Sequence, residues 1–295
     1  MASQETVLLL GFGDIAKRLA KKLSSSYQIT GVRRRSELVQ GITTVQADCS
    51  DLTEMQNLLT QHFDVIVVTM TPSEMSDEGY EKAYVQTVKT LLAALAHNAQ
   101  TPRLLIFVSS SSVYGQQQGE WVDEQASTEP SSYSGKRLLE AENLLSQSEF
   151  ASCSVRFSGI YGPGRRRLIE QVVAGHGAAK EPVLYSNRIH SEDCAGILAY
   201  LIERQKTQVI APVYLASDCE PTPLYDVKQW LAEQLALPVD HLKPKPLGRT
   251  LRSSKRCSNK QLLATGYQFQ YPTFKEGYRA VLESANTDVE RENNG

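Results

Sequence analysis

Residues 7–16 read VLLLGFGDIA, and this stretch decides how the first part of the chain folds. A short apolar run ends in GFGDIA (residues 11–16), which has the form G-x-G-x-x-A. In such a motif the first glycine permits a tight turn and the second lets the backbone approach a pyrophosphate, while the small alanine lets the next helix lie close to the strand. The alternative is a strand-to-helix turn that binds no ligand. We predict a dinucleotide site at the start of this helix, formed by Gly11, Gly13, Asp14 and Ile15.

The same alternation of strand and helix continues through the first 110 residues. Apolar runs at 27–32, 65–70 and 103–109 alternate with stretches of helical spacing at 15–23, 51–61 and 80–98. Continuous apolar strands separated by helices are typical of parallel strands that are covered on both faces. We therefore predict an α/β fold, a doubly wound parallel Rossmann sheet with a smaller C-terminal substrate lobe.

The pattern loosens after residue 150, and this suggests the domain organisation. We expect a nucleotide-binding domain over residues 1–160, to which residues ~190–217 return, and a mainly substrate-binding lobe over 161–285. Residues 238–259 are rich in Pro, Lys, Arg and Ser, which predicts an exposed connection, and residues 286–295 form a polar tail.

Composition excludes several classes of protein. The 295 residues carry 31 basic and 33 acidic side chains, and 41% are hydrophobic, which is ordinary for a globular protein and excludes collagen-like or largely disordered chains. A net charge of −2 argues against a dedicated nucleic-acid binder. The charge is unevenly distributed, since residues 1–150 are acidic on balance and the rest are basic.

The cysteines, the histidines and the apolar runs bear on metal sites, disulfides and cellular location. The five cysteines include no CxxC pair and the histidines show no ligand spacing, so we expect neither a disulfide framework nor a metal site. No apolar run approaches the ~20 residues that span a bilayer, and the N-terminal segment lacks the basic start of a secretory signal. We expect a cytoplasmic protein without membrane contact.

The residues after the second strand predict the cofactor. An acidic residue there would bind the ribose 2′-hydroxyl of NAD(H), but the strand runs into Arg33, Arg34 and Arg35. Arginine pairs well with a 2′-phosphate, so we predict NADP(H) in preference to NAD(H), with Arg33 and Arg34 as its ligands. The alternative is a solvated basic turn. Asp48, just past the third strand, is placed to accept a hydrogen bond from the adenine amino group.

Six segments together resemble a known family. GFGDIA, the QAD turn at 46–48, VSSSSVYG (108–115), the Tyr133 segment, VRFSGIYGPG (155–164) and NRIHSEDCAG (187–196) follow the order found in extended short-chain dehydrogenases/reductases, in the branch of NAD-dependent epimerase/dehydratase proteins. The likeness covers about residues 5–285, and residues 253–278 are similar to the C-terminal part of atypical bacterial members.

The resemblance implies a catalytic Ser, Tyr and Lys, the last two spaced as Y-x-x-x-K. It places the serine at Ser110 and the tyrosine at Tyr133, with Ser111 as a neighbour able to substitute for Ser110 or to bind the substrate. Four residues later stands Arg137 instead of lysine. An arginine can bind ribose hydroxyls and supply positive charge, but it does not deprotonate and cannot join a proton relay. Lys136 lies about 100° further round the helix and cannot simply take the role.

Two functions follow from this mixture of kept and altered residues. The first is an NAD(P)-dependent, epimerase/dehydratase-like oxidoreductase acting on a hydroxyl or carbonyl of a sugar-like substrate, with or without a linked nucleotide. The second is a non-catalytic NADP(H)-binding sensor or regulatory protein with a degraded active site. RNA binding through the basic C-terminal stretch is disfavoured, because aromatic residues do not alternate with its charges.

The basic half of the chain offers candidate ligands for an anionic substrate. Arg165 follows YGPG directly, and Arg252 lies in the basic stretch 243–260; both are candidates for binding phosphate groups, the alternative being dispersed surface charge. We expect Tyr114 and Tyr161 to be packing residues and His190 to brace the following helix. The resemblance also implies a homodimer formed through helices near 80–98 and 133–148.

Overall fold

A computed structural model describes residues 4–35, 37–238, 240–244 and 254–293, and it divides the chain into two compact units. Unit 1 comprises residues 1–113, 128–156 and 195–214, and unit 2 comprises residues 114–127, 157–194 and 215–295. The chain therefore leaves unit 1 and returns to it twice. Residues 195–214 return to unit 1, and residues 114–127 group with unit 2.

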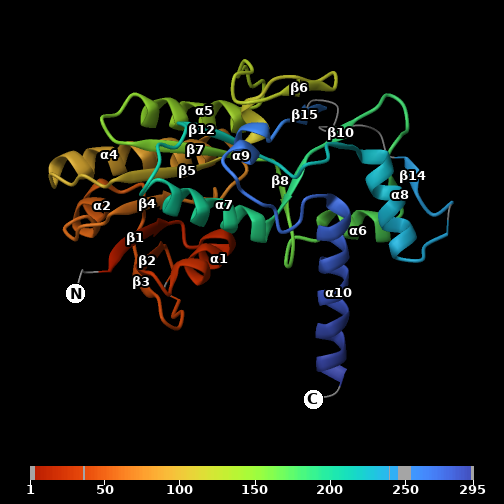
Figure 1. Cartoon of the computed structure of the whole chain (residues 1–295), viewed down its shortest axis with the longest axis horizontal. Coiled ribbons are helices and arrows are strands. Elements are labelled where there is room, and N and C mark those ends of the chain that lie inside the picture. The colour runs from red at the N-terminus through yellow and green to blue at the C-terminus, as the bar shows by residue number, and fades with distance from the viewer. Residues whose placement is uncertain (1–3, 36, 239, 245–253, 294–295) are drawn as a thin grey trace. The chain divides into compact units, whose positions relative to one another are not determined.

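A seven-stranded sheet forms the centre of the fold (Figure 1). Its strands, in their order across the sheet, are β12 (Val213–Ala216), β7 (Ser152–Phe157), β5 (Leu104–Ser110), β4 (Val65–Val68), β1 (Glu5–Leu10), β2 (Tyr27–Arg33) and β3 (Thr43–Gln46). The strands from β3 to β5 pair in parallel. The strand order reverses direction next to β1, which is the arrangement of a doubly wound sheet and confirms the predicted fold class.

The central strands are apolar because they are covered on both faces. In β1 the residues from Val7 to Leu10 are fully buried, and in β4 all four residues, VIVV, are at most 1% exposed. A strand with one solvated face would alternate polar and apolar residues instead. The continuous apolar runs in the sequence are thus a direct consequence of burial on two sides.

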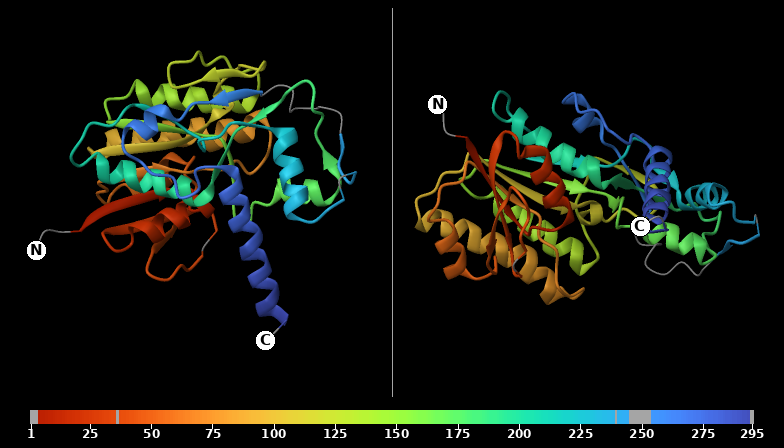
Figure 2. Two further views of the ribbon diagram at one scale, coloured as in Figure 1. Left: turned by 45° about the vertical axis from the view of Figure 1, so that its right-hand side comes forward. Right: turned by 90° about the horizontal axis from the view of Figure 1, so that it is seen from below.

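Helices cover both faces of this sheet (Figure 2). α2 (Leu52–Leu58), α4 (Thr87–His97) and α5 (Tyr133–Ser146) lie along one face, and α1 (Asp14–Leu23) and α7 (Ser191–Arg204) lie along the other. Side-chain oxygens cap two of the helix N-termini: Asp51 accepts a hydrogen bond from the Glu54 amide at 2.9 Å, and Ser132 accepts one from the Gly135 amide at 3.2 Å.

The stretch predicted as one helix over 80–98 is interrupted. A single turn, α3 (Asp77–Tyr80), leads into a π-helical turn, η1 (Glu81–Gln86), and only then into α4. A π turn accommodates one extra residue in a helix and often lies at a functional site. Here it directs Tyr84 onto Phe107 of β5, with ring centroids 6.1 Å apart.

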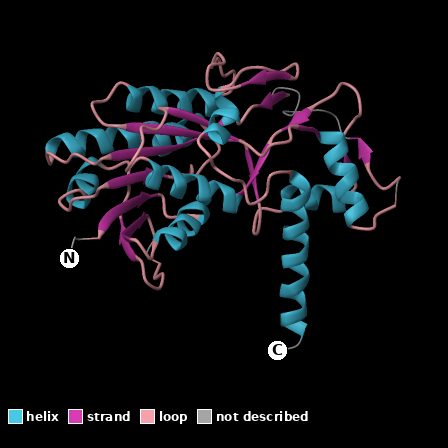
Figure 3. Cartoon of the chain, in the orientation of Figure 1, coloured by secondary structure: helices cyan, strands magenta, loops and turns pink. Residues whose placement is uncertain are grey.

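Unit 2 is built from short strand pairs and helices (Figure 3). Its strand pairs are β6 (Glu120–Val122) with β15 (Lys255–Cys257), β8 (Gly159–Tyr161) with β11 (Arg188–His190), β9 (His176–Gly177) with β14 (Lys243–Pro244), and β10 (Tyr185–Ser186) with β13 (Thr222–Pro223). Its helices are α6 (Arg167–Val173), α8 (Leu224–Gln234), α9 (Lys260–Ala264) and α10 (Phe274–Asn293). α6, α8 and α10 share one hydrophobic core, which includes Tyr161, as expected for a packing residue.

One prediction about this unit is wrong. Residues 238–259 were expected to be an exposed connection, but Lys255–Cys257 form a strand in which Lys255 is 3% and Cys257 is 1% exposed. Residues 239 and 245–253 lie outside the described part of the chain. Composition does not reveal this strand, because the strand is buried by pairing with β6, which lies far away in the sequence.

Candidate functional site

The turn between β1 and α1 has the geometry that the glycine motif predicts. Gly11 adopts a φ of +88°, and a Cβ atom there would lie 2.9 Å from the backbone of Thr69 and Met70. Thr69 holds the turn, since its hydroxyl donates to the Gly11 carbonyl at 2.8 Å. Only glycine combines this backbone conformation with this close approach.

Gly13 has a different role in the same turn. A Cβ atom there would meet only the Gly11 carbonyl oxygen, at 3.9 Å, so packing within the chain does not require glycine. Gly13 is the N-cap of α1, and no side chain caps that helix end. The free space and the exposed helix amides fit the pyrophosphate of a dinucleotide.

A pocket of about 540 Å³ joins this turn to the basic cluster after β2. Its lining includes Gly11 and Gly13 on one side and Arg33, Arg34 and Arg35 on another. Thr69, Met70, Thr71 and Ser73, which follow β4, complete a further wall. The structure therefore brings together the phosphate turn and the arginines that the sequence places about twenty residues apart.

The arginines of this pocket differ in their partners. Arg33 forms an ion pair with Glu37, which also accepts a hydrogen bond from Lys17 at 2.6 Å. Arg34 and Arg35 are exposed. Because Glu37 compensates the charge of Arg33, Arg34 is the better placed of the two predicted ligands to bind an added phosphate.

The other predicted cofactor residues lie around the same pocket. Asp14 pairs with Arg18 at 2.8 Å, and the side chain of Ile15 is buried. Asp48 lines a small adjoining cavity of about 20 Å³ together with Arg34. Burial raises the pKa of Asp48, but hydrogen bonds from Ser50 and the ammonium of Lys82, 3.1 Å away, outweigh it and hold the pKa below its usual value. Asp48 is thus an ionised acceptor at neutral pH.

The serine turn and the helix that carries the tyrosine pack tightly against each other. Ser110 ends β5, and its hydroxyl accepts a hydrogen bond from the Ser112 amide at 3.1 Å; Ser111 begins the short 3-10 turn that follows. In α5, a Cβ atom on Gly135 would lie 2.3 Å from the Ser112 carbonyl oxygen. Gly135 therefore allows the first turn of α5, with Tyr133, to lie against the serine turn.

Tyr133 and Arg137 have partners that the sequence did not predict. The Tyr133 hydroxyl donates to the backbone carbonyl of Met75 at 2.6 Å. Arg137 makes two parallel hydrogen bonds to Asp77, at 2.7 and 2.9 Å, and contacts Glu81 and Glu140 at 3.5 and 2.9 Å. The guanidinium holds the pKa of Asp77 below its usual value. Arg137 thus binds carboxylates from the segment after β4, and its predicted contact with the ribose remains a prediction.

A buried ion pair supports this region from behind. Arg156 of β7 donates to Glu142 of α5 through Nη2 at 2.6 Å and through Nε at 3.1 Å, and both residues are 5% exposed. The Ser109 hydroxyl donates to the same carboxylate. These three side chains link α5 to β5 and β7 at the residue before Ser110. A glutamate in the middle of an amphipathic helix carries no sequence signal for such a role.

Of the predicted substrate residues, Ser111 lies in unit 1, Arg165 lies in unit 2, and Arg252 lies outside the described residues. Arg165, Arg166 and Arg167 are exposed at the start of α6, and Arg252 falls outside the described residues. His190 braces α7 as expected, since its Nδ1 accepts a hydrogen bond from the Glu192 amide at 3.2 Å. Arg256 lies between the rings of Trp121 and Tyr185, 5.0 and 4.9 Å from their centroids.

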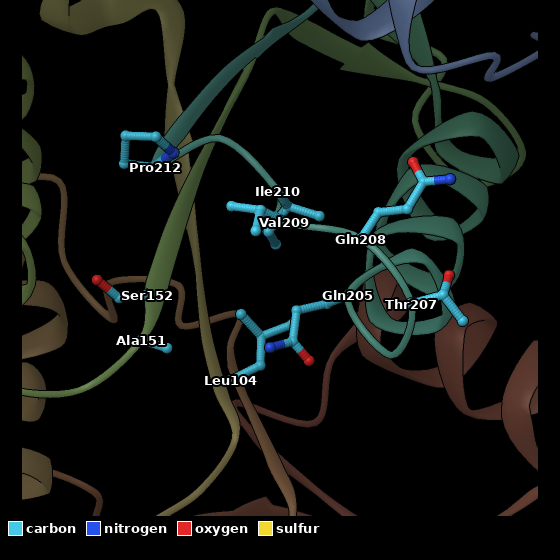
Figure 4. Close-up of a pocket in the computed structure, with 9 residues that line it drawn as sticks. All are labelled: Leu104, Ala151, Ser152, Gln205, Thr207, Gln208, Val209, Ile210 and Pro212. Atoms are coloured by element: carbon cyan, nitrogen blue, oxygen red, sulfur yellow. The ribbon is translucent and has the colours of Figure 1, made fainter.

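A second pocket, of about 470 Å³, lies at the opposite end of the strands (Figure 4). Leu104 and Ser152, the first residues of β5 and β7, line it together with the segment after α7 that includes Gln205, Gln208 and Ile210. None of its lining residues is ionisable. Doubly wound sheets bind ligands at the carboxyl ends of their strands, so we assign the chemistry to the glycine pocket instead.

Comparison with known proteins identifies relatives of this chain. The family model described as the NAD-dependent epimerase/dehydratase family matches residues 7–214. Protein YeeZ of Escherichia coli strain K12 is 28% identical over 288 residues, which cover 90% of this chain and 96% of YeeZ. A solved structure from Methylobacillus flagellatus, described as an NAD-dependent epimerase/dehydratase, is 32% identical with a TM-score of 0.80, covering 96% of this chain and 100% of that one.

More distant structures share the fold. UDP-glucuronic acid 4-epimerase from Bacillus cereus, solved with UDP-glucuronic acid and NAD, is 20% identical with a TM-score of 0.77, covering 94% of this chain and 98% of its own. Among the described residues, no helix is long and apolar enough to cross a membrane. The chain belongs to the NAD-dependent epimerase/dehydratase family.

Proposed function

We propose that the protein is an NADP(H)-dependent oxidoreductase of the epimerase/dehydratase type, acting on a hydroxyl or carbonyl carbon of a sugar or nucleotide-linked sugar. The observation that carries this proposal is the single pocket lined by Gly11, Gly13 and Arg34. An anion-binding turn and a guanidinium in one pocket suit the pyrophosphate and the 2′-phosphate of one dinucleotide. The substrate class rests on family membership and on the motifs that resemble sugar-nucleotide enzymes.

Different residues of unit 1 have different roles in the proposed reaction. The amides at the start of α1 and the open space at Gly13 bind the pyrophosphate, and Arg34 binds the 2′-phosphate. The bound nicotinamide supplies or accepts the hydride. Ser110 orients the reacting oxygen of the substrate, and the Tyr133 hydroxyl exchanges a proton with it. Arg137 takes no proton itself, and its part is to hold the ribose hydroxyls of the cofactor.

The proposed preference for NADP(H) can be measured directly. We expect the protein to bind NADPH more tightly than NADH, and Arg34→Ala to weaken NADPH binding by about tenfold or more while NADH binding changes by less than about twofold. The reason is that only NADPH carries the phosphate with which the guanidinium pairs. Isothermal titration of both cofactors with both proteins gives the four dissociation constants.

Arg33→Ala is the matched control for this prediction. It removes the same charge from the same pocket, but Glu37 already compensates that charge, so its effect on NADPH should be smaller. Equal affinities of the unaltered protein for the two cofactors, or tighter binding of NADH, would refute the preference.

Turnover on a substrate panel tests the proposed reaction. Purified protein is incubated with NADPH or NADP⁺ and with a set of UDP-, dTDP- and GDP-sugars and their keto derivatives. Change in nicotinamide absorbance reports reduction or oxidation, and chromatography of the sugars reports epimerisation or dehydration, which need not alter the net cofactor signal. Turnover of at least one sugar nucleotide supports the proposal. Absence of cofactor binding would contradict it.

A second candidate function is supported by one observation. Arg137 stands where the family has lysine, and it binds Asp77, Glu81 and Glu140. A protein that kept the dinucleotide pocket but lost the proton relay would serve as an NADP(H) sensor or regulatory partner. Tight NADPH binding without turnover on any member of the panel would favour this function.

The proposed assembly is a homodimer. The resemblance to the family implies an interface through the two helices α4 and α5, which lie along one face of the sheet (Figure 2).

A further inference from the structure

The segment Ser73–Tyr80, called here the 73–80 segment, connects the dinucleotide pocket with the proposed catalytic residues. Ser73 lines the pocket of about 540 Å³ that also contains Gly11 and Arg34. Gly79 lines the small adjoining cavity with Arg34. Between these two points, Met75 and Asp77 contact Tyr133 and Arg137. One short segment therefore touches both halves of the proposed active site.

The first contact occupies the hydroxyl that the proposed reaction needs. A phenol has one hydrogen to donate, and Tyr133 donates it to the Met75 carbonyl at 2.6 Å. While this bond exists, Tyr133 cannot donate to a substrate oxygen. The Tyr80 ring also packs edge-on against the Tyr133 ring, with centroids 5.5 Å apart.

The second contact explains why arginine is a useful replacement for lysine. Nε and Nη2 of Arg137 donate in parallel to the two oxygens of Asp77, at 2.7 and 2.9 Å. This paired arrangement requires the planar fork of a guanidinium, and a lysine ammonium cannot form it. Nη1 additionally donates to Glu140 of the same helix at 2.9 Å, which fixes the orientation of the fork.

The 73–80 segment is held together by contacts among its own residues. The Ser76 hydroxyl accepts a hydrogen bond from the Gly79 amide at 3.0 Å, and a Cβ atom on Gly79 would lie 2.3 Å from the Glu74 carbonyl oxygen. The π turn Glu81–Gln86 follows directly. Such turns depart from regular α-helical hydrogen bonding and commonly accompany functional sites. We therefore place the hinge of the 73–80 segment at this turn.

We infer that the 73–80 segment is a gate, held closed over Tyr133 by the paired hydrogen bonds between Arg137 and Asp77, and that a dinucleotide entering the pocket beside Ser73 opens it. Asp77 is then a positioning residue, which acts on the reaction through Arg137 and Tyr133. This inference rests on the proposed function for the role of Tyr133. It gives Arg137, which stands at the lysine position of Y-x-x-x-K, a role in controlling access to Tyr133.

Hydrogen exchange of the protein without cofactor tests the closed state. Asp77→Asn should raise amide exchange in residues 74–81 on the order of tenfold, because it removes a charge and one acceptor of the paired hydrogen bonds. Glu74→Gln is the matched control, since it makes the same charge change in the same segment on an exposed side chain, and exchange should stay unchanged. Equal exchange in the two variants would overturn the inference.

Arg137→Lys provides a second variant with an independent prediction. It keeps the charge but removes the fork, so exchange in residues 74–81 should rise as in Asp77→Asn. Because it also restores the family spacing Y-x-x-x-K, with a lysine that can join a proton relay, turnover should increase. An Arg137→Lys variant with unchanged exchange would show that the fork does not hold the segment.

Addition of NADPH tests the opening step. In the unaltered protein NADPH should increase exchange in residues 74–81, and Asp77→Asn should bind NADPH about threefold more tightly or better, because less of the protein is closed. Decreased exchange on binding, or weaker binding by Asp77→Asn, would contradict the gate. If no variant binds NADPH, the proposed function fails and so does cofactor-driven opening, whereas the experiment without cofactor still decides whether Asp77 and Arg137 hold the segment.

Discussion

Tyr133→Phe is expected to lower the turnover number by about 100-fold or more, while the dissociation constant of NADPH changes by less than about twofold. Phenylalanine keeps the ring that packs against Tyr80 but removes the hydroxyl that exchanges the proton. The loss also removes the hydrogen bond to the Met75 carbonyl, so cofactor access should not become worse. Turnover is measured with the best substrate of the panel, and binding by titration.

Tyr80→Phe is the control for this prediction. Tyr80 lies beside Tyr133, and its hydroxyl contacts only the sulfur atom of Met75 among the hydrogen-bond partners found in the described residues, at 3.7 Å. Its removal should leave turnover within about threefold. If the two variants lost turnover equally, Tyr133 would not be the acid/base group, and the sensor function would gain support.

Glu142→Ala is expected to reduce the free energy of unfolding by about 3–5 kcal/mol, measured by urea denaturation. Arg156 is 5% exposed, and Glu142→Ala removes a carboxylate that pairs with this buried guanidinium. The Ser109 hydroxyl would lose its acceptor at the same time. The penalty arises mainly from removing a carboxylate partner of a buried charge, since an intact buried pair contributes little net stability.

Two comparisons isolate that cause. Glu140→Ala removes a carboxylate from the same helix, but Glu140 retains 40% of its side-chain exposure, so the cost should stay within about 1 kcal/mol. Replacing Glu142 and Arg156 together by methionine should recover most of the stability lost by Glu142→Ala, because no charge is left buried. A Glu142→Ala variant as stable as Glu140→Ala would show that the pair does not matter for folding.

The fold and the glycine turn after β1 could be predicted from the sequence because their determinants are local. Burial on both faces requires continuous apolar strands, which VLLL and VIVV display, and the left-handed backbone at Gly11 requires glycine. The basic cluster after β2 is equally local, and the structure places Arg33, Arg34 and Arg35 along the pocket that contains the turn.

The remaining features depend on residues that meet only after folding. Arg137 pairs with Asp77, which lies 60 positions away in the sequence. Lys255 is buried because its strand pairs with a strand more than 130 residues earlier. Glu142 of α5 pairs with Arg156 of β7. In each case the side chain is charged, and sequence patterns predict that such a side chain is exposed to solvent. Charge and periodicity report only on the segment that contains the residue, and they do not reveal a partner elsewhere in the chain. The sequence by itself determined the Rossmann sheet and the place of the glycine turn. Only the tertiary structure decided which charges are buried, and that the tyrosine and arginine of the altered motif are held by the segment after β4.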